Sequence, residues 1–365
     1  MAADPRDLAR WVEVHRLAVA GRQPEIARNV GGRVCRVWLL TSRFAAVEAM
    51  ATATLTLGPD ADALFQRGWA WSSTGRPWLA LEDYQQAMIL YQQAADRSGE
   101  AATLNNIGSV YDGLGDRQQA LYNYHRALPI RREAGNRAGE AVILNNIGLV
   151  YDGLGDRQRA LDHYHQALPI LRTVGDRFGE AATLNNIGLV YHGSGDRQQA
   201  LDHYHQALPI RREIGDRFGE AATLNNIGLV YHGLGNRQRA LDHYRQALLI
   251  TQEVSNRSGE AVTLTNIGSV YDSLGDRQRA LDHYHQALPI RREIGDRAGE
   301  AVTRYNIAMI HRAGGDLDQA IRELEQVVDL DRQVDHPDLE ADTAFLEQLR
   351  RERAEVRGAE PPAEP

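Results

Sequence analysis

A block of forty residues, copied along the chain, constrains the fold more than any other feature of this sequence. The five closest copies match almost residue for residue without an insertion, and they cover residues 101–140, 141–180, 181–220, 221–260 and 261–300. Residues 61–100 and 301–340 follow the same frame more loosely, which makes seven units. A fixed period of about 20 to 50 residues indicates a repeat protein whose units pack mainly on their neighbours.

Each unit has the pattern of two helices. In the unit 181–220, apolar and small residues recur at spacings of three and four, which is typical of a buried helix face. Gly195 and Asp196 interrupt this spacing, because glycine favours a helix end and aspartate accepts hydrogen bonds from the first N–H groups of a helix. The sequence therefore predicts an all-α chain of helical hairpins.

The recurring positions resemble those of the tetratricopeptide repeat. In the second unit the matching residues are Leu104, Gly108, Tyr111, Ala120, Tyr124 and Ala127, and equivalents run through residues 61–340. The usual repeat has about 34 residues and a closing proline, whereas this one has forty and lacks that proline. The longer variety is similar to Pins/LGN-type scaffolds, kinesin light chains and many bacterial regulatory proteins. This resemblance implies a right-handed superhelical solenoid with helical caps at both ends.

Residues 1–58 do not follow the forty-residue frame, and two interpretations are open. They are a helical cap or a degenerate repeat, with Ala46 and Ala53 in place of the repeat alanines, because the ends of a solenoid need shielding. Alternatively, residues 24–43 form a helix-turn-helix that binds DNA. The second interpretation rests on the spacing of Ala27, Gly31 and Val37.

The C-terminal end has its own pattern. Residues 59–340 are expected to form the repeat domain and residues 341–356 a capping helix, with apolar side chains on one side. The tail, residues 357–365, contains AEPPAEP and is expected to be disordered.

Composition excludes several classes of chemistry. All 41 basic residues are arginine, so mechanisms that need a lysine, including Schiff bases and the P-loop, are excluded. A net charge of −8 offers no global field for nucleic acid or anionic lipid. Cys35 is the single cysteine and is expected to be a buried apolar residue. No apolar run reaches the length of a membrane span or a signal peptide, so we expect a cytoplasmic protein.

The segment Leu-Asn-Asn-Ile-Gly begins at residues 104, 144, 184 and 224. Asparagine inside a helix costs up to ~0.7 kcal/mol relative to alanine, so its repetition needs a reason. Helical geometry places the second asparagine on the inner wall of the solenoid and the first on its flank. The first becomes Phe65, Thr265 and Tyr305 in the divergent units, whereas the second stays an amide in all seven units.

Two interpretations of these amides are open. A carboxamide has both donor and acceptor atoms and can pair with any peptide backbone, and in Pins/LGN-type and kinesin light chain solenoids asparagines at this position clasp an extended peptide. Otherwise the amides bridge neighbouring helices or water. The candidate peptide-binding residues are the amides Gln66, Asn106, Asn146, Asn186, Asn226, Asn266 and Asn306, the flanking Asn145, Asn185 and Asn225, and Leu149, Leu189, Leu229, His192 and His232.

The sequence thus favours a non-enzymatic scaffold that binds an extended or helical segment of a partner protein. A histidine column at positions 163, 203, 243 and 283 is expected on the outer wall, and we expect no metal, cofactor or catalytic site, since a cluster repeated five times singles out no pocket. The alternative is a signalling regulator that senses a peptide or binds DNA through its N-terminal segment. Self-association, with the groove occupied by another copy's tail or N-terminus, is a third possibility.

Overall fold

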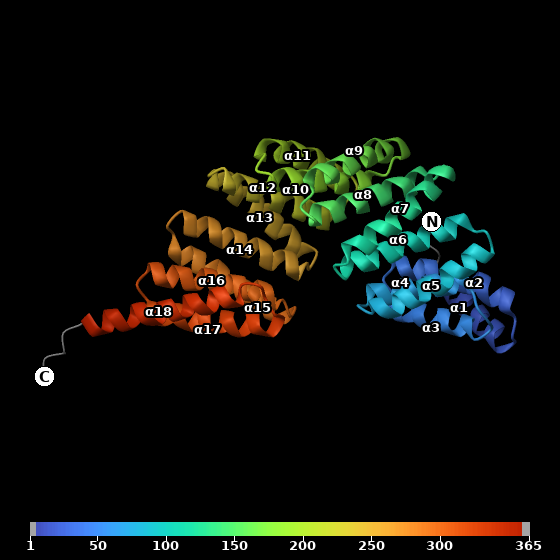
Figure 1. Ribbon diagram of the computed structural model, residues 1–365, viewed down its shortest axis with the longest axis horizontal. Coiled ribbons are helices and arrows are strands. Elements are labelled where there is room, and N and C mark those ends of the chain that lie inside the picture. The colour runs from blue at the N-terminus through green and yellow to red at the C-terminus, as the bar shows by residue number, and fades with distance from the viewer. Residues whose placement is uncertain (1–4, 360–365) are drawn as a thin grey trace. The chain divides into compact units, whose positions relative to one another are not determined.

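The computed structural model describes residues 5–359, which form α-helices joined by short turns, with no β-strand among them. The chain divides into two compact units, Met1–Gly179 and Glu180–Pro365, and each is described by itself. Consecutive helices pack on one another within each unit, as can be followed in Figure 1. No helix in this part of the chain is both long and apolar enough to cross a membrane.

The first unit contains α1 (Pro5–Ala20), α2 (Pro24–Leu40), α3 (Phe44–Leu55), α4 (Ala61–Ser73), α5 (Pro77–Gln93), α6 (Arg97–Gly113), α7 (Arg117–Glu133), α8 (Arg137–Gly153) and α9 (Arg157–Val174). Helix α10 (Arg177–Gly193) begins just before the boundary. The second unit continues with α11 (Arg197–Glu213), α12 (Arg217–Gly233), α13 (Arg237–Glu253), α14 (Arg257–Ser273), α15 (Arg277–Glu293), α16 (Arg297–Ala313), α17 (Leu317–Val334) and α18 (Leu339–Ala359). The predicted hairpins are confirmed: α4 is the first helix and α5 the second of the first repeat, and the alternation continues to α17.

The helix ends form as the sequence predicts. The Asp116 carboxylate accepts the N–H of Gln119 at 3.0 Å and so caps α7. The residue before the cap has a left-handed backbone, with φ of 80° at Gly115. Ala95 and Ser255 hold the equivalent place in two joints, with φ of 54° and 55°. Glycine is therefore favoured there because it adopts this conformation without strain.

The core of each hairpin is a tyrosine of the second helix packed on a glycine of the first. Tyr164 is fully buried, and a Cβ added to Gly148 would lie 2.5 Å from its ring. The last repeat has Leu324 and Ala308 at these two positions, both fully buried. In this repeat the second helix has a smaller side chain, leucine in place of tyrosine, and the first helix a larger one, alanine in place of glycine. The two changes together preserve close packing.

Successive hairpins are joined by a buried carboxylate. Glu140, at the start of α8, is 3 % exposed. Its Oε1 accepts the Nε–H of Arg132 from α7 at 2.8 Å, and its Oε2 contacts Arg137. Glu100, Glu180, Glu220, Glu260 and Glu300 are buried at the same repeat position. Because both oxygens of Glu140 are paired, the carboxylate links α7 to α8 without leaving an uncompensated charge.

The N-terminal residues correct one prediction. Residues 24–40 form the single helix α2, so the segment 24–43 is not a helix-turn-helix. A Cβ added to Gly31 would lie 3.0 Å from His15 and 3.1 Å from Thr54, whose side chains are hydrogen-bonded at 2.8 Å. Gly31 therefore serves close packing of three helices, and its presence in the sequence does not mark a turn.

Two alanines of α3 and the single cysteine of α2 were also singled out in the sequence. Ala46 and Ala53, expected in place of the repeat alanines, are only partly buried, and α3 buries Val47 and Thr54 instead. Cys35 is buried, and its burial raises the pKa of the thiol to about 12. The thiolate is thus disfavoured, as for a packing residue.

At the other end, α18 packs on α17. Leu346 and Leu349 are buried against Leu324 and Val328. The helix spans Leu339–Ala359, so it begins before residue 341 and continues through the first three residues of the tail that we expected to be disordered. The rest of that tail lies outside the described residues.

Candidate functional site

The predicted amides lie on the first helices of the repeats and are paired with one another across neighbouring repeats. The Nδ2 of Asn146 donates to the Oδ1 of Asn105 at 3.0 Å. The same bond joins the second asparagine of one repeat to the first asparagine of the repeat before it at Asn226–Asn185 (3.1 Å) and Asn266–Asn225 (3.0 Å). The asparagines in these bonds are all partly exposed. In the divergent units, Gln66 and Thr265 at the equivalent positions are buried. The two asparagines of the motif are thus hydrogen-bonding partners.

Where the first asparagine is replaced, this pairing changes. Phe65 holds the first position before Asn106, and the Asn106 amide lies 3.4 Å from the Tyr84 hydroxyl. Thr265 holds it before Asn306, and its hydroxyl donates to the Ala261 carbonyl and accepts from Arg291. The divergent repeats therefore satisfy their polar groups by other contacts.

Gln66 differs from the asparagines with which the sequence grouped it. Its side chain is 4 % exposed, and its Nε2 donates to the Gly32 carbonyl at 3.1 Å. Helix α2 covers it, because α2 packs on α4 as well as on α3. Gln66 is therefore a packing residue and is not open to a ligand.

Small recesses open beside the asparagines at equivalent places in the two units. One, of about 160 Å³, is lined by Asn225, Asn226, Thr251 and Val262 among others. The other, of about 240 Å³, is lined by Asn105, Asn106, Arg131 and Val142 among others. Each of these residues lies 120 positions from its counterpart, so both recesses are copies of one site. Each is formed by the first helices of two neighbouring repeats and the end of the second helix between them.

Apolar side chains flank the amides and remain exposed. Leu149, Leu189 and Leu229 are 41 %, 40 % and 37 % exposed, and Val142, Val262 and Val302 are also exposed. The sequence placed the leucines on the same wall as the amides. The arrangement offers partly satisfied amides beside apolar contacts, which suits an extended or helical peptide.

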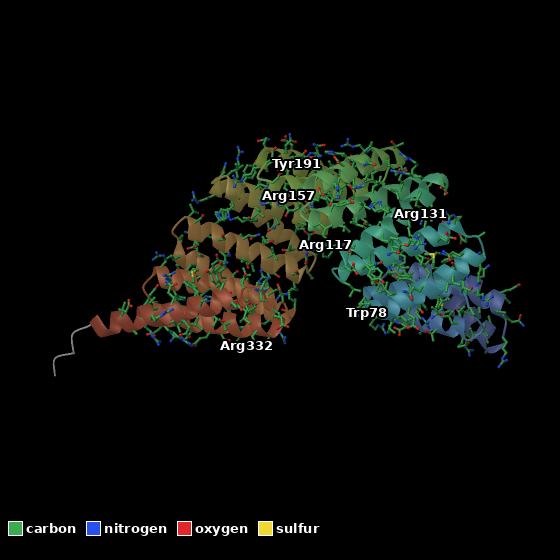
Figure 2. All side chains as sticks on the ribbon, viewed as in Figure 1. Trp78, Arg117, Arg131, Arg157, Tyr191 and Arg332 are labelled. Atoms are coloured by element: carbon green, nitrogen blue, oxygen red, sulfur yellow. The ribbon has the colours of Figure 1, made fainter. Side chains whose placement is uncertain are left out.

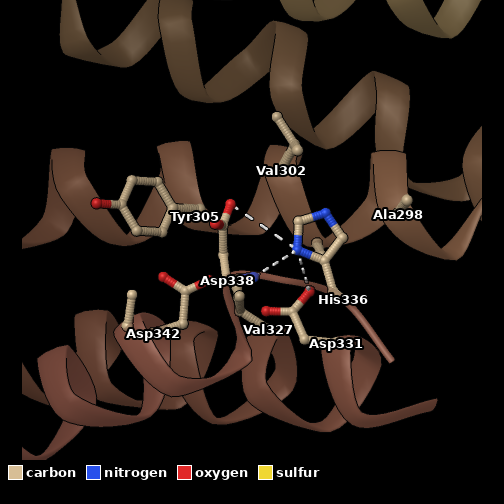
Figure 3. A pocket seen from close by; sticks show the side chains of 10 residues that line it. Ala298, Val302, Tyr305, Val327, Asp331, His336, Asp338 and Asp342 are labelled. Atoms are coloured by element: carbon tan, nitrogen blue, oxygen red, sulfur yellow. Dashed lines mark hydrogen bonds and ion pairs between the residues drawn. The ribbon is translucent and has the colours of Figure 1, made fainter. Parts of the chain in front are cut away.

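A third recess, of about 330 Å³, was missed by the sequence analysis (Figure 3). It is the copy of the same site at the last repeat, because Val302, Tyr305, Asp331 and Asp342 stand 80 positions after Ala222, Asn225, Thr251 and Val262. The signal was present in the sequence. Asp331 is a carboxylate at a repeat position where other repeats bury an uncharged residue, such as Thr251 or Leu171.

The three recesses differ in charge at one repeat position. Thr251 is neutral and Asp331 is acidic. Arg131, labelled in Figure 2, is basic. Arg211 and Arg291, at the same position, are neutralised by Asp216 and Asp296. Arg131 has Asn136 in place of that aspartate, and burial lowers the pKa of its guanidinium. Its Nη1 donates to the hydroxyl of Ser98 at 3.3 Å.

The histidines have packing contacts. His192 and His232 are partly buried beside the amides, and burial, followed by the charge of a nearby arginine, lowers the pKa of each imidazole. His163 of the second-helix column stacks on Tyr151 of the first helix at 5.5 Å and 6°. The same stack occurs at Tyr191–His203, Tyr231–His243 and Tyr271–His283. Within residues 5–359, no three His, Cys, Asp or Glu side chains are grouped to hold a metal ion.

Comparison with known proteins gives a family and a fold. The tetratricopeptide repeat family matches residues 73–133, 99–173, 179–253, 219–293 and 259–333, which together are more than half of the chain. No curated protein matches by sequence.

Among solved structures, the apo form of the quorum sensor NprR from B. thuringiensis is 17 % identical, with a TM-score of 0.70 over 88 % of this chain and 97 % of that one. BtubC from P. vanneervenii is 22 % identical, with a TM-score of 0.52 over 63 % of this chain and 92 % of that one. A Rap protein complexed with competence and sporulation factor is 13 % identical, with a TM-score of 0.57 over 96 % and 99 %. At these identities the likeness concerns the fold.

Proposed function

Because this chain belongs to the tetratricopeptide repeat family, we propose that it is a non-enzymatic, cytoplasmic scaffold that binds a segment of a partner protein. The segment lies along the first helices of the repeats, over the amide pairs and the recesses beside them. The observation that carries the proposal is the recurrence of one recess, with two adjacent asparagines of the repeat motif in its lining, at equivalent repeat positions.

The amide pairs leave groups for a ligand. The bond from Asn226 to Asn185 uses one N–H of the first amide and one lone pair of the second. A carboxamide has two N–H donors and two acceptor lone pairs, so hydrogen-bonding capacity remains on both residues. The pairing also holds the amides in one orientation, which reduces the entropy lost when a backbone binds.

The exposed leucines supply the apolar part of the surface. Leu149, Leu189 and Leu229 recur at forty-residue spacing beside the amides and are each more than a third exposed. Burial of apolar area contributes roughly 25 cal/mol per Å². A partner segment with apolar side chains at regular spacing would bury the leucines of one unit, such as Leu189 and Leu229, while its backbone meets the amides.

The solved structures support a peptide-sized partner. One similar protein is described as a quorum sensor, and another was solved with competence and sporulation factor bound. They also favour a second candidate function, a regulator that changes state when it binds a peptide. Small-angle scattering with and without a selected peptide distinguishes the two, since a sensor changes its dimensions on binding and a rigid scaffold keeps them.

The experiment that tests the proposal selects peptides from a displayed random library with the full chain and measures their affinity by calorimetry. We expect Leu229→Asp to weaken a selected peptide by about tenfold or more, because it places a charge in the apolar contact. The matched control is Leu249→Asp, at a leucine of α13 that is 68 % exposed on the second helix of the same repeat. Equal losses in both variants, or no loss in either, would contradict the proposed face. Light scattering of the free protein tests whether a second copy occupies it.

A further inference from the structure

Apolar and acidic side chains together line the recess at the last repeat (Figure 3). Helix α16 contributes Ala298, Val302 and Tyr305, and α17 contributes Val327 and Asp331. The link after α17 and the first turns of α18 add His336, Asp338, Ala341 and Asp342. Neither arginine nor lysine is among the residues that line it. Three carboxyl groups thus face a space of about 330 Å³ without a permanent positive charge.

Asp331 is the group that most needs a partner. The residue is 2 % exposed, and its Oδ2 is buried without a hydrogen-bond partner among the described residues. Burial of an ionised carboxylate without compensating bonds costs several kcal/mol. The other buried carboxylates at the joints differ in this respect, since Glu140 and Glu220 each have both oxygens on arginines.

His336 makes no hydrogen bond to this carboxylate. Its Nδ1 is 4.0 Å from Oδ1 of Asp331 and 3.8 Å from Oδ2 of Asp338, both longer than a hydrogen bond. The backbone N–H of Asp338 points to the same Nδ1 at 3.3 Å. The ring therefore lies beside the two carboxylates without a hydrogen bond to either.

Asp342 lies beside Asp331 in the same recess. Burial first, and then a side-chain hydrogen bond with Asp331 and the negative charge of that residue, raise the pKa of the Asp342 carboxyl to about 6. The equivalent residues of the recess beside Thr251 carry no charge. Thr251, the counterpart of Asp331, satisfies its hydroxyl on the Leu248 carbonyl at 2.9 Å, and Val262 stands where Asp342 stands. The acidic groups are thus additions to a recess that packs without them.

We propose that this recess binds an organic cation, an alkylammonium or guanidinium group, which Asp331 holds together with Asp338 and Asp342. The cation supplies the donor that Oδ2 of Asp331 lacks, and its carbon stem lies against Val302, Val327 and Tyr305. A ligand with an apolar stem fits these walls better than a hydrated metal ion does. The cation is either a free amine or a basic side chain of a bound partner. The inference does not depend on the amide-lined face.

Calorimetry of the full chain with n-butylammonium and n-butylguanidinium tests the proposal, with n-butanol as the neutral probe of the same length. We expect the two cations to bind and to raise the melting temperature, and n-butanol to do neither. Asp331→Asn should weaken the cations by about tenfold or more, because it removes a charged acceptor. The control is Asp329→Asn, an exposed acid of α17 with the same change of charge, which should bind as the unaltered protein does.

Two outcomes overturn the proposal: n-butanol binds as well as the cations, or Asp331→Asn binds them unchanged. Circular dichroism establishes that Asp331→Asn is folded, and Asp342→Asn serves as a second variant, with a smaller expected loss.

A second experiment, with peptides, identifies the source of the cation. Peptides with one arginine and the same peptides with citrulline are compared on the protein and on Asp331→Asn. Binding by arginine peptides alone assigns the cation to a partner, binding by free amines alone assigns it to a small molecule, and binding by neither contradicts the site.

Discussion

The recess beside Thr251 and the recess beside Asp331 are the same place in two repeats and differ in chemistry. Both lie between the first helix of one repeat and the helix that follows the hairpin, α14 in one case and α18 in the other. The polar side chains that line the first are amides and two threonine hydroxyls, whereas those that line the second are three carboxyl groups, a histidine and a tyrosine. A repeat protein can therefore change the charge of one site while the hairpins that form it stay the same.

The largest effect should come from making the neutral recess acidic. In Thr251→Asp, the new carboxylate would be buried where Thr251 is 2 % exposed, and no arginine lines that recess. We expect the variant to lose about 3 kcal/mol of stability at pH 7, measured as the midpoint of urea unfolding. Thr251→Val is the control for loss of the hydroxyl. A loss no larger than that of the control would mean that the recess accommodates a lone carboxylate, and the comparison would fail.

The opposite change should stabilise the acidic recess. Asp331→Thr removes a buried charge and restores a residue type that packs at this position in the other recess. We expect a gain of about 1 to 2 kcal/mol at pH 7 in the same measurement. Asp329→Thr, at an exposed site on α17, should leave the midpoint nearly unchanged. A loss of stability in Asp331→Thr would show that the carboxylate has a structural partner.

The two recesses should also differ in their response to pH. The pKa of Asp342 is about 6 in the folded chain against 3.8 for the free group, so the folded state holds this proton more tightly. Its contribution is therefore favourable at low pH and is lost as the pH rises through this range. Asp331, His336 and Asp338 face the same group, and Tyr305 adds a hydroxyl. Relative to Asp342→Asn, the unaltered protein should lose stability as the pH rises from 4 to about 6. Melting temperatures of both proteins across this pH range measure the loss. An identical pH profile for the two proteins would contradict the shift.

The smallest effect concerns the amides. Asn226→Ala removes the bond to Asn185 and should cost about 1 kcal/mol, partly offset by the better helix propensity of alanine. Asn306→Ala, where Thr265 stands in place of the first asparagine, should be close to neutral or stabilising. Melting temperatures of both variants decide this. Equal effects would mean that the amide pair contributes nothing to stability.

The repeat pattern was sufficient to predict the hairpins, because helix faces, caps and turns depend on nearby residues. It also predicted that the asparagines lie on the first helices, where they are partly exposed. The pairing of Asn146 with Asn105 was not predictable in detail, since it depends on how far one repeat is displaced along the next. The interpretation of Gly31 as a turn failed because a glycine required for close packing looks the same in sequence.

The errors at the two ends have a common cause. Gln66 aligns with the asparagines, but α2 covers it, and a repeat alignment does not show what lies beyond the last regular copy. Asp331 and Asp342 depart from the pattern, and comparison of the near-identical units passes over such departures. The recess also depends on how α18, and the link that joins α17 to it, pack against α16, and the repeat pattern does not specify this packing.

The asparagine pairs have a consequence for how such a chain changes length. Each bond joins a residue to another 41 positions earlier, and the acceptors Asn185 and Asn225 stand at the same place in their repeats. If recombination between copies removed residues 221–260, the amide of Asn266 would meet Asn185 in place of Asn225. The joint would form again from parts already present. The number of recesses can thus change in a single genetic event, with no new interface to be selected.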